Sequence, residues 1–307
     1  MSKKKILAAV DGSAYSSQSL AYLSRLYGDD QDCDVELLHV VSASSSQTWM
    51  LEVDPYRSRP PEVERRLLAA QRYQNEAKDR LLRHGFSEQR VCCQALATSA
   101  GVATTIQHHA ASGLYDALLI GRRGVGRIGE MLFGSVSAWL LEKCFDIPLW
   151  IVDGDVQTNR FLLAVHGSTR SLFAADHLGY MLQNRGETEI LLYHSSALLQ
   201  TRQDLDLTIL HARWGEEWCR EHLDSADNLF HAHEQILRDA GIAAERIRRL
   251  PAQHNLDASH DLLRQAKKHD CGTLVIGRRG PESTRRFLSS VSQRALQQFE
   301  NLAAWIV

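Results

Sequence analysis

The fold of this chain is decided by the stretch Gly121-Arg122-Arg123-Gly124-Val125-Gly126-Arg127-Ile128-Gly129-Glu130-Met131-Leu132-Phe133-Gly134-Ser135. It follows a short apolar run at 117–120, which predicts a buried parallel strand. It precedes Val136, Leu140 and Cys144, whose spacing places them on one face of a helix that Ser135 would cap. Backbone N–H groups converge at such a helix start, so the stretch predicts an anion-binding site.

The glycines of this loop have two explanations. Gly121 and Gly124 would let the backbone approach a ligand closely, and Gly134 would leave room at the helix start. A mobile surface loop is the alternative that the glycines alone leave open. The Walker pattern ends in Gly-Lys-Ser/Thr, which this loop does not, and a dinucleotide fingerprint would follow the first strand rather than the fourth. Any phosphate bound here is therefore held by a loop of neither the Walker type nor the dinucleotide-binding type.

Composition is that of a globular protein of about two domains, with 307 residues, 44% apolar and 23% charged. The net charge of −2 and the pI near 6.7 give no overall field that would attract nucleic acid or an anionic membrane. The apolar run Ile6–Val10 behind Lys3–Lys5 is too short for a signal peptide or a membrane span. We expect a cytoplasmic protein with no nucleic-acid and no membrane partner.

Cysteine and histidine usage predicts neither disulfides nor a metal site. The six cysteines are irregularly spaced. Cys92 and Cys93 are neighbours in an expected strand and point to opposite faces, which favours unreactive thiols over a redox pair. There is no Cys-x-x-Cys or His-Glu-x-x-His pattern, and His231 and His233 do not share a helix face.

Strands and helices alternate through the first half. We expect strands at 6–10, 35–41, 90–96, 116–121 and 148–152. Helices are expected at 62–84, at 99–111, after the glycine loop, and through Leu20, Leu23 and Leu26 with a stop at Gly28. This alternation predicts a parallel α/β sheet. The connection at 42–61 is long, and Trp49–Leu51 within it would pack locally or cover a ligand.

The pattern then begins again. Phe161–Ser168 matches Ile6–Ser13, and Thr273–Gly280 matches Ala117–Gly124, at nearly the same offset along the chain. The chain is therefore a duplicated domain. The expected bounds are 1–153 for the first domain and 160–307 for the second.

A resemblance to the universal stress protein family rests on Gly121-x₂-Gly124-x₉-Gly134-Ser135 together with Ala9-Val10-Asp11-Gly12-Ser13. Leu37–Val40 is similar to the sequence that is usual in this family at the end of the second strand. The resemblance covers both halves, complete in the first and partial in the second, and the length suggests a tandem two-domain member. It implies two doubly wound five-stranded parallel sheets of order 3-2-1-4-5, of the adenine nucleotide alpha hydrolase-like type.

The resemblance also implies ATP, with or without Mg²⁺, or a related adenine nucleotide such as AMP, in the first domain. Ligands of doubly wound sheets lie where chain direction switches, here between the first and fourth strands. Asp11 and the backbone of Val40 would contact adenosine, while the glycine loop and the next helix start would hold the phosphates. The full set implied is Ala9, Val10, Asp11, Val40, Ile120, Gly121, Arg123, Gly124, Arg127, Gly134, Ser135 and Val136.

Three of these residues have a second interpretation. Asp11 is also suited to a turn before Gly12 that caps the next helix. Arg123 and Arg127 would each contribute about 1.5–3 kcal/mol through charge-assisted bonds to phosphate if ordered, or would be solvated.

The second half departs from the family pattern. His166 stands at the position of Asp11, Ser289 replaces the third glycine, and Pro281 removes an amide donor. We expect no ATP bound there in the same way. The second domain is then a structural partner, or it binds another ligand near His166, His194, Gly277, Arg278 and Gly280.

The expected function is nucleotide binding with a regulatory or protective role in the stress response, without catalytic residues. Glu130 has no second carboxylate nearby, so slow hydrolysis or autophosphorylation has no support. The alternative is a nucleotide-independent scaffold that presents a docking surface to a protein partner. A nucleotidyl-transfer enzyme is a third class, but a His-x-Gly-His stretch is absent from the sequence.

We expect the two domains to form an intrachain pseudo-dimer, and the whole chain to be able to form a homodimer. Leu149–Val152 and Ala304–Val307 are terminal apolar strands that would be exposed edges in isolated domains. Residues 1–155 expressed alone should therefore dimerise or aggregate. A well-behaved monomer in light scattering would contradict the pairing.

Overall fold

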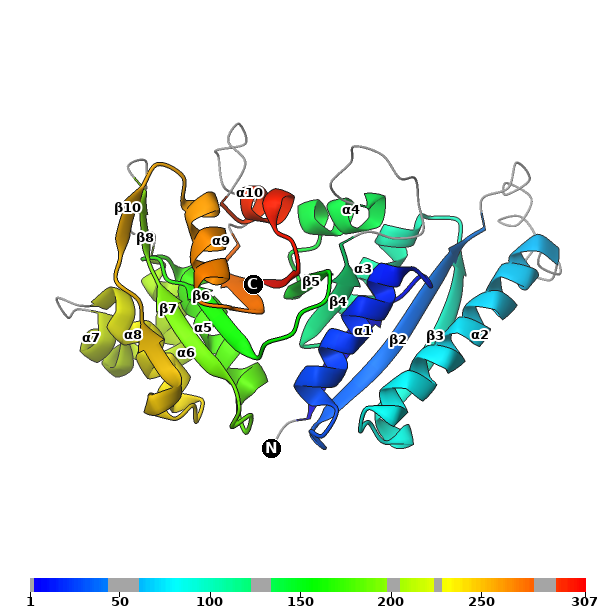
Figure 1. The fold of residues 1–307 in the computed structure, drawn as a ribbon, viewed down its shortest axis with the longest axis horizontal. Coiled ribbons are helices and arrows are strands. Elements are labelled where there is room, and N and C mark those ends of the chain that lie inside the picture. The colour runs from blue at the N-terminus through cyan, green and yellow to red at the C-terminus, as the bar shows by residue number, and fades with distance from the viewer. Residues whose placement is uncertain (1–2, 44–60, 123–133, 198–204, 224–227, 279–290) are drawn as a thin grey trace. The chain divides into compact units, whose positions relative to one another are not determined.

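The computed structural model describes residues 3–43, 61–122, 134–197, 205–223, 228–278 and 291–307. The chain divides into two compact units, Met1–Asp155 and Val156–Val307. Each unit contains one main twisted parallel sheet with helices on both faces (Figure 1). Within the described residues, no helix combines the length and the hydropathy that a membrane crossing requires.

The first unit alternates strands and helices as the sequence predicts. Its strands are β1 (Lys4–Ala9), β2 (Cys33–Ser42), β3 (Val91–Thr98), β4 (Ala117–Gly121) and β5 (Leu149–Asp153). Its helices are α1 (Ala14–Tyr27), α2 (Pro61–Arg83), α3 (Val102–Ser112) and α4 (Ser135–Lys143). The sheet has the order β3-β2-β1-β4-β5, with parallel pairing throughout. The predicted order 3-2-1-4-5 is confirmed.

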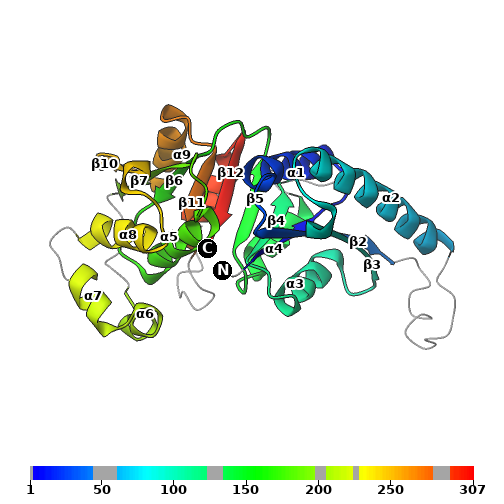
Figure 2. The ribbon, with the colours of Figure 1, turned by 90° about the horizontal axis from the view of Figure 1, so that it is seen from below.

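Burial on both faces explains the continuous apolar strands. In Figure 2, α1 and α2 lie on one face of this sheet, and α3 and α4 lie on the other. Residues 117–120 of β4 are buried accordingly. Gln74 is a buried polar exception on α2, and its Nε2 donates to the carbonyls of Leu37 and Gln94, 2.7 Å from each. These bonds satisfy the buried amide and tie α2 to β2 and β3.

The second unit repeats this topology. Its main strands are β6 (Arg160–Ala164), β7 (Glu189–Tyr193), β9 (Ile247–Arg249), β11 (Thr273–Ile276) and β12 (Leu302–Ile306). Its sheet has the order β9-β7-β6-β11-β12, again 3-2-1-4-5 by position in the unit. Helices α5 (Thr169–Leu182) and α8 (Asn228–Asp239) lie on one face of the sheet. Helices α9 (Ala258–Lys268) and α10 (Val291–Gln298) lie on the other.

The second unit also carries additional elements. Helices α6 (Leu207–Trp214) and α7 (Glu216–Leu223) follow one another beside α8 (Figure 2). A small parallel pair joins β8 (Ser195–Ala197) to β10 (Gln253–Asn255). The α/β class and the repeated doubly wound fold are therefore confirmed, while the packing of the two units as a pseudo-dimer stays a prediction.

Two local expectations are corrected or confirmed at side-chain level. Helix α4 is capped by Gly134, which has no side chain, so the expected cap at Ser135 is wrong by one residue. The thiol of Cys92 lies 3.7 Å from the carboxylate of Glu36, and that of Cys93 lies 3.7 Å from the carbonyl of Gln74. The two cysteines therefore point to opposite faces of β3, as the strand period predicts.

Candidate ligand site at the carboxyl edge of the first sheet

The carboxyl ends of β1 and β4 lie side by side. Ala9 of β1 is in register with Ile120 of β4 on one side and with Leu38 of β2 on the other. From this edge the chain continues outward to β2 in one direction and to β5 in the other. This is the switch point at which doubly wound sheets bind ligands. Two helices, α1 and α4, begin at the same edge.

Asp11 organises the turn between β1 and α1. Its Oδ1 accepts from the amide of Ser13 (3.0 Å) and from the hydroxyl of Ser16 (2.5 Å). Its amide donates to the hydroxyl oxygen of Ser16 (3.0 Å), and Ser13 is the N-cap of α1. The turn interpretation of Asp11 is thus realised in the structure, with Ser13 rather than Asp11 as the cap. Contact between Asp11 and a nucleotide stays a prediction.

His39 and Tyr73 lie next to this turn and were not predicted as site residues. Gly12 has φ +81°, and a Cβ at that position would lie 3.6 Å from the ring of Tyr73. The rings of His39 and Tyr73 meet edge to face, with centroids 6.2 Å apart. Burial lowers the pKa of His39, and the carboxylate of Asp11 opposes that shift. The Nδ1 atom of His39 is buried with no hydrogen-bond partner among the described residues.

The sequence contains a signal for His39 but none for Tyr73. His39 lies inside the Leu37–Val40 stretch on which the resemblance partly rests. Tyr73 is one aromatic residue in a long amphipathic helix, and nothing local distinguishes it.

Arg122 fixes the start of the glycine loop. Its side chain is 3% exposed, and its Nη1 donates to the carboxylate of Asp153 at 2.9 Å. Its amide donates to the carbonyl of Val152, which extends the pairing of β4 with β5. A buried guanidinium needs such a partner. Arg122 is therefore a structural residue of the loop base.

The loop closes on itself at its two ends. The amide of Gly134 donates to the carbonyl of Arg122 (3.1 Å), and the hydroxyl of Ser137 donates to the carbonyl of Gly121 (2.8 Å). The N–H of Gly134 was expected to bind phosphate. It is instead used in the hydrogen bond to Arg122 that joins the two ends of the loop. The amides of Ser135 and Val136 belong to the first turn, where a helix offers no acceptor. They become the main phosphate donors expected from α4.

Gly121 has a packing role as well. A Cβ at Gly121 would lie 2.9 Å from Cβ of Tyr15 and 3.1 Å from its carbonyl oxygen. In the second unit, a Cβ at Gly277 would lie 2.5 Å from the carbonyl oxygen of Arg170. Both glycines let the end of a strand touch the first turn of a helix. Gly277 is therefore explained without any ligand.

Several predicted residues cannot be placed. Arg123, Gly124, Arg127 and Gly280 lie outside the described residues. Ala9, Val10, Val40 and Ile120 line the strand ends at the edge, and the last three are buried. Across the described part of the chain, no group of three His, Cys, Asp or Glu side chains could hold a metal ion.

The second unit rebuilds the same turn around a histidine from another helix. The amide of His166 donates to the hydroxyl oxygen of Ser171 (2.9 Å), as that of Asp11 does to Ser16. Since His166 replaces the carboxylate, the Ser171 hydroxyl meets Nε2 of His233 at 2.8 Å. Nδ1 of His233 lies 2.6 Å from the carbonyl of Leu229, so Nδ1 carries the proton and Nε2 accepts from Ser171.

Two further residues predicted for the second unit, His194 and Arg278, lie at the same edge. His194 is the counterpart of His39, and its Nδ1 donates to the carbonyl of Val165 (2.8 Å). The rings of His166 and His194 are 6.5 Å apart. The amide of Arg278 donates to the carbonyl of Val307, as that of Arg122 does in the first unit.

His233 makes stability depend on pH. Its side chain is 1% exposed, and burial lowers its pKa from 6.5 to about 4. The folded state thus favours the neutral ring, so this stabilisation is complete above pH 6.5 and is lost as the pH falls toward 4. We expect the free energy of unfolding to drop by up to about 3 kcal/mol over this range.

Urea unfolding at several pH values measures this effect. His233→Gln keeps an acceptor for Ser171 but does not titrate, so its pH slope should be flatter. His260→Gln, at an exposed histidine of α9, should keep the full slope. Equal slopes for His233→Gln and the unmodified chain would contradict the assignment.

The fold and this edge define a doubly wound α/β protein with a candidate ligand site at the switch point of its first sheet. A sequence model described as the universal stress protein family matches residues 3–153. The chain belongs to the universal stress protein family through this first half. No curated protein matches it.

Solved structures share the fold over nearly the whole chain. A universal stress protein from Archaeoglobus fulgidus DSM 4304 is 17% identical with a TM-score of 0.65, and the match covers 98% of this chain and 97% of that one. A putative universal stress protein from Pseudomonas aeruginosa UCBPP-PA14 is 15% identical with a TM-score of 0.55, covering 99% and 93%. At these identities the likeness concerns the fold alone.

Proposed function

We propose that the first unit binds one adenine nucleotide, ATP in the first instance, at the carboxyl edge between β1 and β4. The observation that carries the proposal is the start of α4. The loop before it is closed by the Gly134–Arg122 hydrogen bond, and Ser135 is exposed directly after it. The first-turn amides and the positive end of the helix dipole then point at the edge, which favours phosphate.

The remaining parts of the edge suit the rest of the nucleotide. The buried ends of β1 and β2, with Val10 and Val40, offer an apolar surface and backbone groups to adenosine. His39 and Asp11 add polar groups on the side of α2. Mg²⁺ would enter as Mg·ATP, with phosphate and water oxygens as its main ligands.

We do not propose a nucleotide site in the second unit. Its counterpart of Asp11 is His166, and its turn is held by the neutral His233 rather than by a carboxylate. We therefore infer one nucleotide per chain and a regulatory or protective role in the stress response, in the cytoplasm.

Native mass spectrometry and calorimetry with Mg·ATP test the proposal on the full chain. We expect a stoichiometry near one and, in competition, a weaker response to AMP, which lacks the terminal phosphates. A stoichiometry near two would contradict the asymmetry. No bound nucleotide and no heat with Mg·ATP would favour the scaffold alternative, in which the chain recognises a protein partner without nucleotide.

A further inference from the structure

Two histidines face each other between α7 and α8 in the second unit. His222 lies in the last turn of α7, and His231 lies near the start of α8. Nδ1 of His222 is 2.9 Å from Nε2 of His231, and the centroids of the two rings are 5.0 Å apart. Each helix therefore presents one ring nitrogen to the other.

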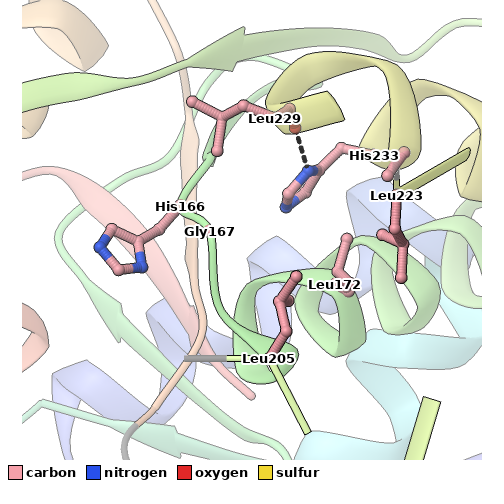
Figure 3. A pocket seen from close by; sticks show the side chains of 8 residues that line it. His166, Gly167, Leu172, Leu205, Leu223, Leu229 and His233 are labelled. Atoms are coloured by element: carbon pink, nitrogen blue, oxygen red, sulfur yellow. Dashed lines mark hydrogen bonds between the residues drawn. The ribbon is translucent and has the colours of Figure 1, made fainter. Parts of the chain in front are cut away.

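Packing around the pair holds the two rings in place. Leu223 follows His222 on α7 and lines a small pocket together with Leu229 and Ala232 of α8 (Figure 3). This pocket has a volume of about 20 Å³, which is room for about one water molecule. The ring of Trp218 also packs against His222, with centroids 4.8 Å apart. These contacts fix α7 on α8 beside the histidines.

The additional segment of the second unit creates the pair. The amides of Phe86 and Ile242 make matching hydrogen bonds at the ends of α2 and α8. Counting back from them along the two helices places Asn75 at the position of His231. Asn75 is exposed, whereas His231 is half-buried beside α7. The inserted helix thus brings its own histidine to a histidine of the repeated fold.

The distance between the two nitrogens suits neighbouring ligands of one metal ion. Imidazole nitrogens bind divalent transition metals at about 2.0–2.1 Å, so two of them at right angles are about 2.9 Å apart. Two ligands of a tetrahedral ion would be about 3.3–3.4 Å apart. Octahedral, square-planar and tetragonal ions place neighbouring ligands at right angles, and Ni²⁺ and Cu²⁺ with nitrogen and oxygen ligands are of this kind.

The protons of two neutral rings are compatible with metal binding. In the metal-free pair, one of the two facing nitrogens donates its N–H to the other. An ion needs both nitrogens as electron-pair donors, so the protons then lie on Nε2 of His222 and Nδ1 of His231, and none leaves the neutral pair. Oε2 of Glu221 lies 3.9 Å from Nε2 of His222 on an exposed side chain that can close this gap. A carboxylate behind a ligating histidine is a usual outer partner.

We propose that His222 and His231 form a binding site for one divalent transition-metal ion of the Ni²⁺ and Cu²⁺ class. His222 binds through Nδ1 and His231 through Nε2. Since no third His, Cys, Asp or Glu ligand joins them within the described residues, water molecules occupy the remaining positions. His231 is partly exposed, which gives the ion and its waters access. The bound ion replaces the hydrogen bond between the rings and links α7 to α8.

Titration of the full chain with Ni²⁺, without nucleotide, tests the site. With water ligands Ni²⁺ is octahedral and paramagnetic, so it broadens nearby signals in NMR spectra of the chain labelled with ¹⁵N-histidine. We expect saturable broadening at His222 and His231 with a stoichiometry near one, and a higher midpoint of thermal unfolding. Mg²⁺, which prefers oxygen ligands, should cause neither. Equal broadening at His166 and His194, or no saturable binding, would overturn the proposal.

Two substitutions remove one ligand each. His222→Gln and His231→Gln keep a polar amide between the helices but lack the imidazole. Loss of an outer partner of a metal ligand costs about 10–100-fold in affinity, so loss of a ligand should cost at least about tenfold. His260→Gln, at an exposed histidine of α9, is the matched control and should leave the Ni²⁺ affinity unchanged.

A third substitution tests the site without changing either ligand. Glu221→Gln, at a side chain that is 71% exposed, should retain the fold and weaken Ni²⁺ binding severalfold by removing the negative charge. Unchanged Ni²⁺ affinity in His222→Gln or His231→Gln would overturn the proposal. The stoichiometry of Mg·ATP should be the same in all four variants, because the pair lies in the second unit.

Discussion

Placing an aspartate at Ser135 is expected to weaken ATP binding at least a hundredfold without destabilising the fold. A negative charge about 5 Å from a phosphate costs about 3 kcal/mol at the effective dielectric of a protein surface, which corresponds to roughly a hundredfold in affinity. The same charge in the first turn of α4 stabilises the helix by about 0.3–1 kcal/mol through its dipole. Ligand binding and folding should therefore change in opposite directions.

Calorimetry with Mg·ATP and thermal unfolding together check this result. Ser135→Ala removes one hydroxyl and should cost about fivefold. Gln71→Glu adds the same charge on an exposed position of α2 and should leave the affinity within a factor of two. Gly134→Val should cost less than Ser135→Asp, because Gly134 has φ −67° and ψ 150°, which valine adopts readily. An unchanged affinity in Ser135→Asp would remove α4 from the site.

Replacing Gly277 with alanine is expected to destabilise the second unit by about 3 kcal/mol. The added Cβ would lie 2.5 Å from the carbonyl oxygen and 2.6 Å from the carbonyl carbon of Arg170. These are backbone atoms at the start of α5, so relief requires the helix to move away from the sheet. Overpacking of this kind costs about 1–3 kcal/mol, and a rigid backbone neighbour places it at the upper end.

Two comparisons isolate this effect. Gly121→Ala should cost less, because its closest contact is the Cβ of Tyr15 at 2.9 Å. Gly186→Ala, in the same unit, meets nothing within 4 Å and should be neutral or slightly stabilising. Urea denaturation measures all three. Similar stabilities for Gly277→Ala and Gly186→Ala would show that the strand end and α5 are not in close contact.

The secondary structure around the first candidate site could be predicted because its signals are local. The apolar run at 117–120 and the residues after it specify a strand, a loop and a helix in sequence, and local geometry needs little more. The duplication was visible as sequence segments repeated at a nearly constant offset along the chain. The strand order came from the family resemblance, and the structure confirms it in both units.

The details at the edge depend on partners that local patterns do not identify. The carboxylate of Asp11 was interpreted as a nucleotide ligand or as part of a capping turn. The structure shows that it braces the turn through Ser13 and Ser16, with Ser13 as the cap, and its contact with a nucleotide stays a prediction. The N–H of Gly134 was expected to face phosphate, and it closes the loop onto Arg122. Neither hydrogen bond follows from composition or periodicity, because each depends on the path of the backbone between the partners.

The sequence by itself determined the α/β class, the duplication and the position of the glycine loop. The class and the loop follow from the order of apolar runs and glycines along the chain, and the duplication follows from the repeated sequence segments. Only the tertiary structure decided that His233 takes over from the missing carboxylate at His166. His233 is 62 residues from Ser171, and α8 brings it to the turn by packing on α5. A small apolar pocket beside the His166–Gly167 turn arises in the same way. Its walls include Leu172, Leu223 and Leu229, which come from separate helices that pack together by burying their apolar faces.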